Sequence, residues 1–316
     1  MRALVLGARG AVGSAASSRL RRSGHEVIGA GRQAPEDGVA IDATTSAGLA
    51  RLAREAARVD VVVDASGLET AAVQAAVGAT PLVDVSATAT HLERLAAGVP
   101  DGGTVLLGAG IAPGLSTVLL HALDPQPGEE FDVAVMLGAG EAHGPAAVEW
   151  TTRLAGENVY AAPEAHPIAN LRSRRKLPLL DGTLREHLRA DFPDDLLVGR
   201  PLGIDVRSWL ALDSQLATAA LRLVGAVPAL APLLRHAPHV GGEAWSVTAV
   251  ARGSGRTLAG AGEGQSGATG RLAAIAATRL VERGLRGAVT MADAVRFDEL
   301  EDAGGITIIK MSAARG

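Results

Sequence analysis

Residues 2–13 read RALVLGARGAVG, an apolar run followed by glycines in the spacing Gly-x-x-Gly-x-x-Gly. The run predicts a β-strand, and the apolar Val12, Ala16 and Leu20 at helical spacing predict a helix directly after it. Glycine between a strand and a helix lets the backbone approach a pyrophosphate, to which the helix N-terminus presents free N–H groups. A dinucleotide site is therefore predicted at Gly7, Arg9, Gly10, Ala11, Val12 and Gly13.

Context gives this glycine pattern its weight, because glycine makes up 39 of the 316 residues. The same spacing recurs at Gly264, Gly267 and Gly270, but this copy follows Glu263, and no strand is expected for about 35 residues after it. The first copy follows a clean strand and opens a complete strand, helix and strand unit. Only the first copy is therefore predicted to bind a dinucleotide.

Strand and helix patterns alternate along the N-terminal part of the chain. A helix is expected from about Ala47, and its cap is Thr44, Thr45 or Ser46. Short apolar or β-branched runs predict strands at residues 26–30, 39–41, 60–64, 81–85 and 104–107. This alternation predicts an α/β fold with a parallel, doubly wound sheet of the Rossmann type.

The end of the second predicted strand indicates which nicotinamide cofactor binds. An acidic residue there would bind a ribose 2′-hydroxyl and specify NAD, but this sequence has Gly31 and Arg32. Arg32 and Arg9 together favour the 2′-phosphate of NADP(H). The ends of later strands extend the predicted cofactor site to Asp42 and Ala43 near the adenine, and to Ser66, Gly67 and Ser86 near the nicotinamide.

Composition excludes several classes of function. The 30 basic and 34 acidic side chains leave a net charge of -4, which offers no electrostatic footprint for nucleic acid or an anionic membrane. There is no cysteine, so disulfides and thiolate nucleophiles are excluded. The only lysines, Lys176 and Lys310, do not follow glycine, which excludes a P-loop. The preference for arginine over lysine suggests a bacterial source.

Other catalytic and targeting patterns are missing as well. Tyr160 is the only tyrosine, and Glu164 stands four positions on, so the Tyr-x-x-x-Lys pair of short-chain dehydrogenases is absent. The histidines are scattered and no metal site is expected. Residues 102–123 are uncharged but hold five glycines and a proline, so we expect no transmembrane helix there. The apolar run at the N-terminus is too short for a signal peptide, and a cytoplasmic location is expected.

Several segments in their order resemble the saccharopine dehydrogenase (saccharopine reductase) superfamily of NAD(P)-dependent oxidoreductases. The segments are GARGAVG at 7–13, VVDASG at 62–67, LVDVS at 82–86, GAGIAPGLS at 108–116, GEAHGPAA at 140–147 and GEGQSGATG at 262–270. The resemblance implies a Rossmann domain, expected at 1–124, and an α+β domain at 125–316 that holds a small-molecule substrate and often builds a homodimer. It also implies hydride transfer to a C=N bond. Residues 171–205 match nothing in the superfamily pattern.

The second half of the chain has patterns of its own. A strand is expected at 131–137, a helix at 145–156, and a hairpin from strands 245–252 and 256–260. An alanine-rich helix at 270–284 is expected to pack back towards the Rossmann domain. The segment between Ala162 and Asp205 is expected to be unpatterned loops that set substrate specificity.

The shortage of lysine and tyrosine favours one kind of hydride acceptor. A ketone needs a proton donor at the developing alkoxide, whereas an iminium ion carries its proton already and needs alignment and a negative environment. The candidate catalytic residues are Glu141, His143, Asp84 and Tyr160. NADPH-dependent reduction of a C=N bond is the preferred prediction, and the alternatives are reduction of an activated C=C bond and a non-catalytic NADP(H)-sensing protein.

Overall fold

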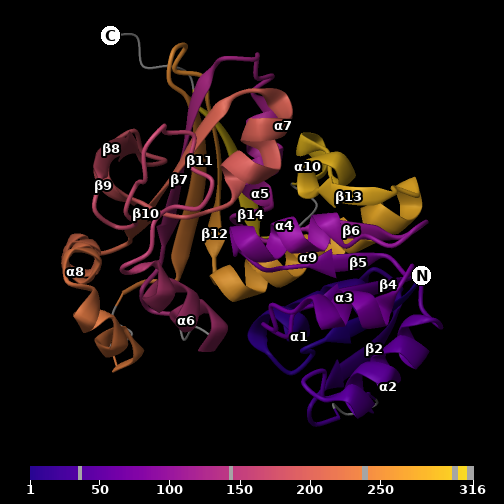
Figure 1. Ribbon diagram of the computed structural model, residues 1–316. Coiled ribbons are helices and arrows are strands. Elements are labelled where there is room, and N and C mark those ends of the chain that lie inside the picture. Colours follow the sequence, from indigo (N-terminus) through magenta and orange to yellow (C-terminus); the bar gives the residue numbers. More distant parts are fainter. Residues whose placement is uncertain (35–37, 142–144, 237–240, 301–304, 312–316) are drawn as a thin grey trace. The chain divides into compact units, whose positions relative to one another are not determined.

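The computed structural model describes residues 1–34, 38–141, 145–236, 241–300 and 305–311 (Figure 1). The chain forms two compact units, and each is described by itself. The first unit comprises Met1–Gly114 and Ser266–Gly304, and the second comprises Leu115–Gln265 and Gly305–Gly316. The sequence predicted a boundary near residue 124 and a helix at 270–284 that packs back towards the Rossmann domain; in the structure the segment that begins at Ser266 belongs to the first unit.

A seven-stranded sheet forms the centre of the first unit, in the order β13-β6-β5-β4-β1-β2-β3. All of its strand pairs are parallel. Six strands in the order β3-β2-β1-β4-β5-β6 form a Rossmann sheet, which confirms the predicted fold class. The strands are β1 (Arg2–Leu6), β2 (Glu26–Gly31), β3 (Val39–Ala40), β4 (Val61–Asp64), β5 (Leu82–Asp84), β6 (Thr104–Leu107) and β13 (Gly287–Thr290).

Helices cover both faces of this sheet, which is why its central strands are continuous apolar runs. Every residue of β4 and β6 is buried. Neighbouring helices α2, α3 and α4 pack side by side (Figure 1). The helices of the first unit are α1 (Ala11–Arg22), α2 (Ser46–Ala56), α3 (Ala71–Val77), α4 (Ala89–Ala97), α9 (Gln265–Arg283, from Ser266 onward) and α10 (Met291–Ala294), with a short 3-10 turn η3 (Phe297–Glu299). Of the three proposed caps of α2, the structure selects Thr45, whose hydroxyl accepts the N–H of Gly48 at 3.0 Å.

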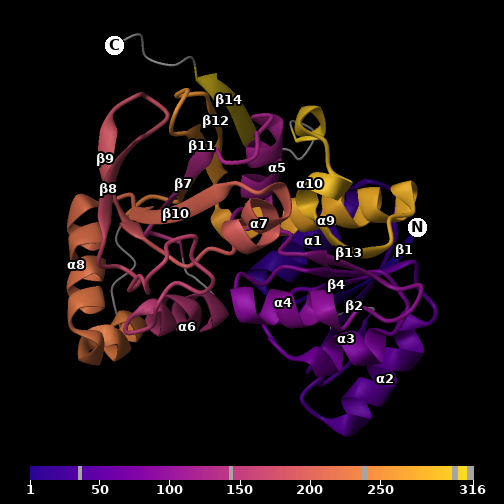
Figure 2. The same cartoon turned by 45° about the horizontal axis from the view of Figure 1, so that its top comes forward.

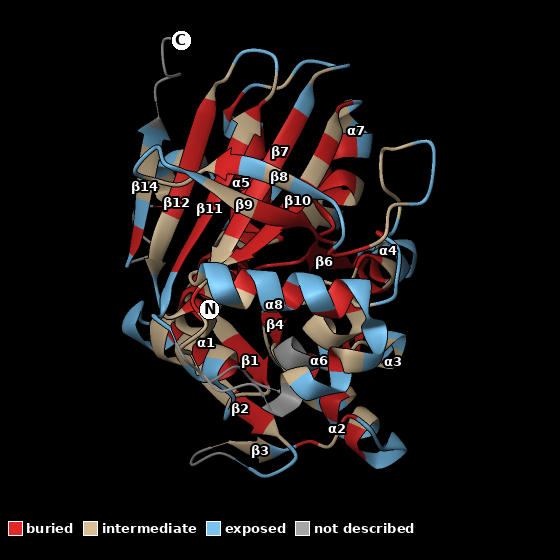
Figure 3. Cartoon of the chain, turned by 90° about the vertical axis from the view of Figure 1, so that its left-hand side faces the viewer, coloured by how far each residue is buried: buried red, intermediate tan, exposed pale blue. Residues whose placement is uncertain are grey.

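The second unit contains a mixed sheet in the order β14-β12-β11-β7-β10-β9-β8. Only the pair β7 and β10 is parallel. Strands β7, β11 and β12 are buried along most of their length (Figure 3). The strands are β7 (Glu130–Leu137), β8 (Arg174–Pro178), β9 (Leu184–Arg189), β10 (Asp205–Leu212), β11 (Ala244–Ala251), β12 (Thr257–Glu263) and β14 (Ile306–Met311). The expected α+β character and the hairpin of β11 and β12 are confirmed.

The helices of the second unit are short, and α8 has the most residues among those that the structure describes. Helix α8 (Gln215–Ala226) packs on β9 and β10, as Figure 2 shows. The others are α5 (Leu115–Ala122), α6 (Pro145–Leu154), α7 (Arg200–Leu202), the π-helical turn η1 (Asp195–Gly199) and the 3-10 helix η2 (Pro228–His236). No helix among the described residues is long and apolar enough to span a bilayer.

Two expectations about irregular segments are wrong. The segment between Ala162 and Asp205 is not only loops, because β8 and β9 pair as an antiparallel hairpin within it. Its strands read RRKLP and LREHLR, so charged side chains hide the alternation that normally indicates a strand. The edge strand β13 follows α9 closely, although no strand was expected there. It was missed because it has only four residues and these are partly exposed, so it leaves little apolar pattern in the sequence.

Gly270 sets how closely α9 approaches α1 within the first unit. A Cβ atom at Gly270 would lie 2.3 Å from the carbonyl oxygen of Val12 and 2.7 Å from Ala15 Cβ. Gly267 lies on the same helix, and a Cβ there would meet only the flexible end of Arg271, at 3.2 Å. Substitutions at the two glycines therefore distinguish the effect of tight packing on stability from the effect of helix propensity.

We expect Gly270→Ala to lower the free energy of unfolding by about 2 kcal/mol, because backbone atoms of α1 cannot move away cheaply. Gly267→Ala is the matched control and should stabilise the protein by about 0.5 kcal/mol, since alanine favours helix. Urea unfolding of both variants measures the difference. Equal effects of the two substitutions would contradict the close packing of α9 on α1.

Candidate functional site

The glycine turn after β1 contains two glycines that the fold itself requires. Gly7 has φ +81°, and a Cβ on it would lie 2.3 Å from the carbonyl oxygen of Ala65. A Cβ on Gly13 would lie 2.3 Å from the carbonyl oxygen of Gly7. Any side chain at either position would therefore break the turn.

Gly10 differs from the other two glycines. It has an ordinary φ of -73°, it is exposed, and the only atom that its Cβ would meet is the carbonyl oxygen of Gly7, at 3.3 Å. Packing therefore gives only a weak reason for glycine at this position. A missing side chain on an exposed, unstrained residue leaves space for a ligand to approach the backbone.

The space beside Gly10 opens onto the N-terminus of α1. Gly10 is the N-cap and has no side chain to accept the first N–H groups of the helix. The N–H of Ser14 bonds to the carbonyl of Gly10, so the N–H groups of the preceding helical residues have no acceptor within the helix. No acidic residue stands in the first turn. The helix end therefore offers free donors and positive potential to an anion.

Two predicted cationic residues lie at this same edge of the sheet. Because β1 and β2 are paired and parallel, Arg9 after β1 and Arg32 after β2 follow neighbouring strand ends. Arg9 Nη1 donates to Gln33 Oε1 at 2.5 Å, and Arg32 is exposed. The charge of Arg32 also helps to lower the pKa of Asp42, although hydrogen bonds from Thr44 are the larger cause.

The loops after three strands use the same local device, in which an aspartate accepts the backbone N–H two residues later. Oδ1 of the aspartate accepts the N–H of Thr44 at 3.1 Å after β3, of Ser66 at 2.9 Å after β4, and of Ser86 at 2.8 Å after β5. The hydroxyls of Thr44 and Ser66 donate to the same oxygens at 2.6 Å. These turns fix the loops that carry the predicted cofactor residues.

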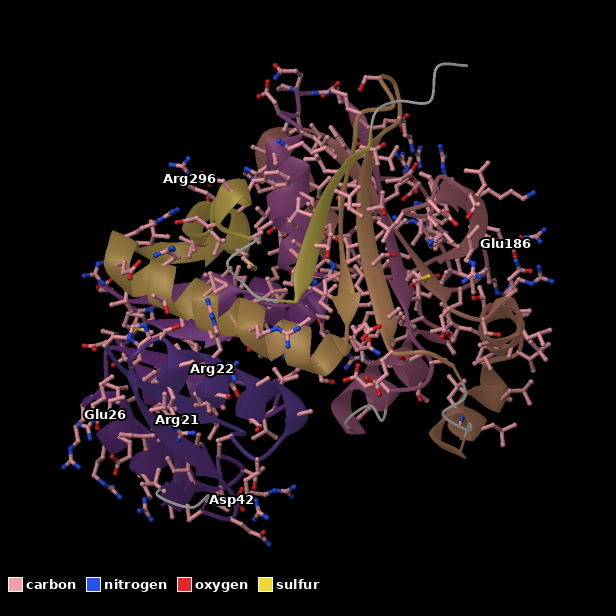
Figure 4. The ribbon with its side chains drawn as sticks, turned by 180° about the vertical axis from the view of Figure 1, so that it is seen from behind. Arg21, Arg22, Glu26, Asp42, Glu186 and Arg296 are labelled. Carbon is pink, nitrogen blue, oxygen red and sulfur yellow. The ribbon has the colours of Figure 1, made fainter. Side chains whose placement is uncertain are left out.

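The predicted cofactor residues of these loops differ in how far they are exposed to solvent. Asp42, labelled in Figure 4, is half-buried and forms the turn into α2, so its contact with adenine stays a prediction. Ala43 is only 4% exposed, so its contact with the cofactor also stays a prediction. Gly67 is exposed with φ +74°, and the half-buried Ser66 and Ser86 precede and follow it along the same edge.

Asp84, predicted to be catalytic, is buried beside a second carboxylate. Asp64 and Asp84 are register partners on β4 and β5, and they are 4% and 2% exposed. Burial and, to a smaller extent, the neighbouring charge of Asp84 raise the pKa of Asp64 to about 6. The direct partners of Asp84 are the N–H of Ser86 and, at 3.5 Å, Nε2 of His91. Its geometry is that of a group that holds a loop, and its catalytic role stays a prediction.

His91 was not predicted from the sequence, although a signal was present. It precedes Leu92 by one position and Leu95 by four on the amphipathic helix α4, and both leucines are fully buried. A histidine at i, i+4 spacing to a core leucine lies on the buried face. Its pairing with Asp84 depends on the arrangement of β5 and α4, which a single sequence does not show.

The remaining catalytic candidates belong to the second unit. Glu141 Oε2 accepts the N–H of Gln265 at 2.6 Å, which gives this carboxylate a structural partner. Tyr160 is 38% exposed. His143 lies outside the described residues.

The structure adds an acidic group near Tyr160 that sequence reasoning missed. The backbone of Tyr160 hydrogen-bonds to the carboxyl of Asp191, whose pKa is raised to about 6 chiefly by burial. Asp191 Oδ1 has no hydrogen-bond partner among the residues that the structure describes. Arg189, 2% exposed, lies near enough to act on the pKa of Asp191 and itself contacts Glu164. No sequence signal marked Asp191, because the surrounding segment has no recognisable pattern.

Comparison with known proteins supports an NAD(P)-binding Rossmann fold for the first unit. Residues 3–93 match the model of the NAD dependent epimerase/dehydratase family. The matched segment runs from β1 into α4 and includes the glycine turn and the loops after β2 to β5. No curated protein sequence matches the chain.

One solved structure is similar to the chain in fold over nearly its whole length, and others match it less closely. A meso-DAPDH variant with DAP from Clostridium tetani E88 covers 95% of this chain and 96% of its own, with a TM-score of 0.50 and 14% identity. A probable aspartate-semialdehyde dehydrogenase from Pseudomonas aeruginosa covers 79% and 73%, with a TM-score of 0.36 and 15% identity. A 3-alpha-hydroxysteroid dehydrogenase from Pseudomonas sp. B-0831, complexed with NADH, covers 31% and 57%, with a TM-score of 0.25 and 21% identity. The family match and the sheet order indicate an NAD(P)-binding Rossmann fold, the kind that many oxidoreductases use.

The pKa of Asp64 predicts how stability depends on pH. Its folded value of about 6 is above the ordinary 3.8, so its contribution to stability is fully present below about pH 3.8 and is lost as the pH rises through about 6. In Asp64→Asn the amide oxygen still accepts the bonds from Ser66 but does not ionise. We expect the variant to gain about 2 kcal/mol of unfolding free energy, relative to the unmodified protein, between about pH 4.5 and pH 7.5.

Asp42→Asn is the matched control for this measurement. The pKa of Asp42 is lowered from 3.8 by its bonds from Thr44, so its ionisation changes stability only below about pH 3.8, and the difference between Asp42→Asn and the unmodified protein should stay constant between about pH 4.5 and pH 7.5. Denaturant unfolding across the pH range compares the two variants. A flat or inverted profile for Asp64→Asn would show that the carboxyl is not strained by burial.

Proposed function

We propose that this protein is an NADPH-dependent oxidoreductase that transfers a hydride to a C=N bond of an amino-acid-derived substrate. The observation that carries the proposal is the exposed Gly10 at the uncapped N-terminus of α1, on a sheet in Rossmann order. Free N–H donors and the helix dipole at this place suit a pyrophosphate. The match of residues 3–93 to an NAD dependent family supports the same conclusion.

The preference for NADPH rests on charge at the end of β2. Gly31 and Arg32 stand where an acidic residue would bind the ribose 2′-hydroxyl of NAD. Arg32 is exposed, and Gln33 binds Arg9 from the neighbouring loop, so two guanidinium groups are available at one edge of the sheet. Guanidinium groups bind phosphate in a bidentate manner, which favours a 2′-phosphate.

The C=N bond is favoured by the side chains that the protein has and lacks. NADPH, when bound, supplies the hydride. An iminium substrate brings its own proton, so the chain has only to align the substrate and stabilise its positive charge. Glu141 and Asp191 are the candidate carboxyl groups for this stabilisation. The similar fold of a dehydrogenase crystallised with DAP supports a substrate derived from an amino acid.

Membership of the saccharopine dehydrogenase superfamily is part of this proposal. The order of the motifs supports it. In the segment 108–116 the backbone takes a path that requires glycine. Gly114 has φ +126°, and a Cβ on it would lie 2.2 Å from the carbonyl oxygen of Gly110. The N–H of Ala109 donates to the carbonyl of Asp84 at 2.7 Å, so this segment is tied to the end of β5.

Arg32→Ala tests the assignment of the cofactor. We expect its affinity for NADPH to fall about tenfold, while its affinity for NADH changes less than about twofold, because only NADPH has a 2′-phosphate. Arg51→Ala, at an exposed position on α2, removes the same charge as a control and should leave the affinity ratio unchanged. Fluorescence titration measures both cofactors. An unchanged ratio in Arg32→Ala would overturn the 2′-phosphate assignment.

Turnover tests the reaction. NADPH oxidation is followed with cyclic imines, with an amine plus a keto acid, and with activated C=C compounds. We expect turnover with at least one C=N substrate. Turnover of C=C compounds alone would overturn the C=N assignment, and NADPH binding without any turnover would favour the sensing alternative.

A further inference from the structure

Three ionisable side chains are buried together at the ends of β4 and β5. His91 is 2% exposed, in the first turn of α4, and its Nε2 lies 3.5 Å from Asp84 Oδ2. This ring nitrogen makes no hydrogen bond to the described residues. Asp64 is the register partner of Asp84 on the adjacent strand, so the two buried carboxylates share one neighbourhood.

The two carboxylates hold the two loops that face the predicted nicotinamide side. Asp64 holds Ser66, and Asp84 holds Ser86, through the bonds to their backbone N–H groups. The loops are also tied to each other, because Thr88 Oγ1 donates to Glu69 Oε1 at 2.5 Å. A movement of Asp84 would therefore be transmitted to both loops.

We propose that His91 is a positioning residue of the dinucleotide site, which holds, through Asp84, the linked loops Asp64–Glu69 and Asp84–Thr88 in the shape that binds the nicotinamide end. This inference rests on the proposed function of the first unit. His91 is buried and does not line the surface of the site. It acts by offering a donor, and when protonated a charge, to the carboxylate that holds Ser86.

The buried ionisable groups around His91 are few. Elements α3, β6 and β13 pack against α4 and carry no ionisable side chain. The ionisable groups on α4, on the strand ends and in the linked loop are Asp64, Asp84, Glu69, Glu93 and Arg94. Glu93 and Arg94 are exposed, so the buried partners of His91 are the two aspartates.

A proton on this cluster favours the bound state for two reasons. A charged His91 attracts Asp84, which shortens the 3.5 Å contact and holds the Ser86 loop more firmly. It also offsets a buried negative charge beneath an anionic dinucleotide. Because the pKa of Asp64 in this cluster is about 6, affinity for the dinucleotide should rise as the pH falls, by at least about threefold between pH 8 and pH 6.

Two variants of His91 separate positioning from simple packing. His91→Leu fills the space but has no donor, whereas His91→Gln keeps an N–H donor and loses only the charge. Each is compared with the unmodified protein and with His166→Gln, which changes an exposed histidine of the second unit. NADPH and NADH titrations are run from about pH 6 to pH 8, and amide exchange of Ser86 is measured by NMR without cofactor. The 2′-phosphate of NADPH titrates equally in all variants, so differences between variants belong to the protein.

We expect His91→Leu to bind NADPH at least about fivefold more weakly and to exchange the Ser86 amide about tenfold faster. His91→Gln should restore protection of the Ser86 amide and the affinity at about pH 8, but its affinity should rise less at low pH, because Asp64 is then the ionisable group of the cluster that gains a proton while the charge of His91 is missing. His166→Gln should behave as the unmodified protein. If His91→Leu does not fold, the pH profile of His91→Gln decides alone.

Failure of this inference differs from failure of the proposed function. If the unmodified protein binds NADPH and both His91 variants keep its pH profile and Ser86 exchange, the inference is overturned and the function stands. If the unmodified protein binds neither NADPH nor NADH, the proposed function and the inference that rests on it are both overturned.

Discussion

The edge of the first unit at which we propose dinucleotide binding depends on carboxylates buried at the ends of neighbouring parallel strands. Parallel pairing in register brings Asp64 and Asp84 side by side, and each holds the loop that follows its strand through the N–H two residues on. Loops fixed in this way present Ser66 and Ser86 at one edge without any contribution from a ligand. The arrangement is strained, since burial and mutual repulsion disfavour two charges, and the pKa of Asp64 is raised to about 6. In our proposal His91 offsets this repulsion and makes the positions of the two loops depend on protonation.

The glycines of the turn after β1 divide into those that the fold requires and one that we attribute to ligand binding. Gly7 and Gly13 have no room for a Cβ atom, so their presence says little about function. Gly10 is exposed and has an unstrained backbone, and glycine there makes sense when something must approach the helix N-terminus. Gly270 resembles the first pair, because it permits α9 to pack on α1.

The sequence was most informative where burial on both faces makes strands continuous apolar runs. Strand β4 reads VVVD and every residue is buried, so the Rossmann half and its glycine turn were predictable. Strand β9, LREHLR, carries charge and shows no alternation, so its hairpin was missed. The sequence could place the proposed site only as positions after strand ends, because parallel strands share an edge. The link from His91 to Asp84 was not, since it depends on strand register and on the placement of α4, neither of which leaves a mark in one sequence.

Hydrogen exchange of the whole protein with and without NADPH, read by mass spectrometry, tests the central claim most directly. The claim is that a dinucleotide binds at the edge built from the glycine turn and the loops after β4 and β5. Binding there should slow exchange in peptides that contain residues 7–13, 64–69 and 84–88, because these backbones would be covered or held. No change in these three segments at saturating NADPH, or protection confined to the second unit, would contradict the account.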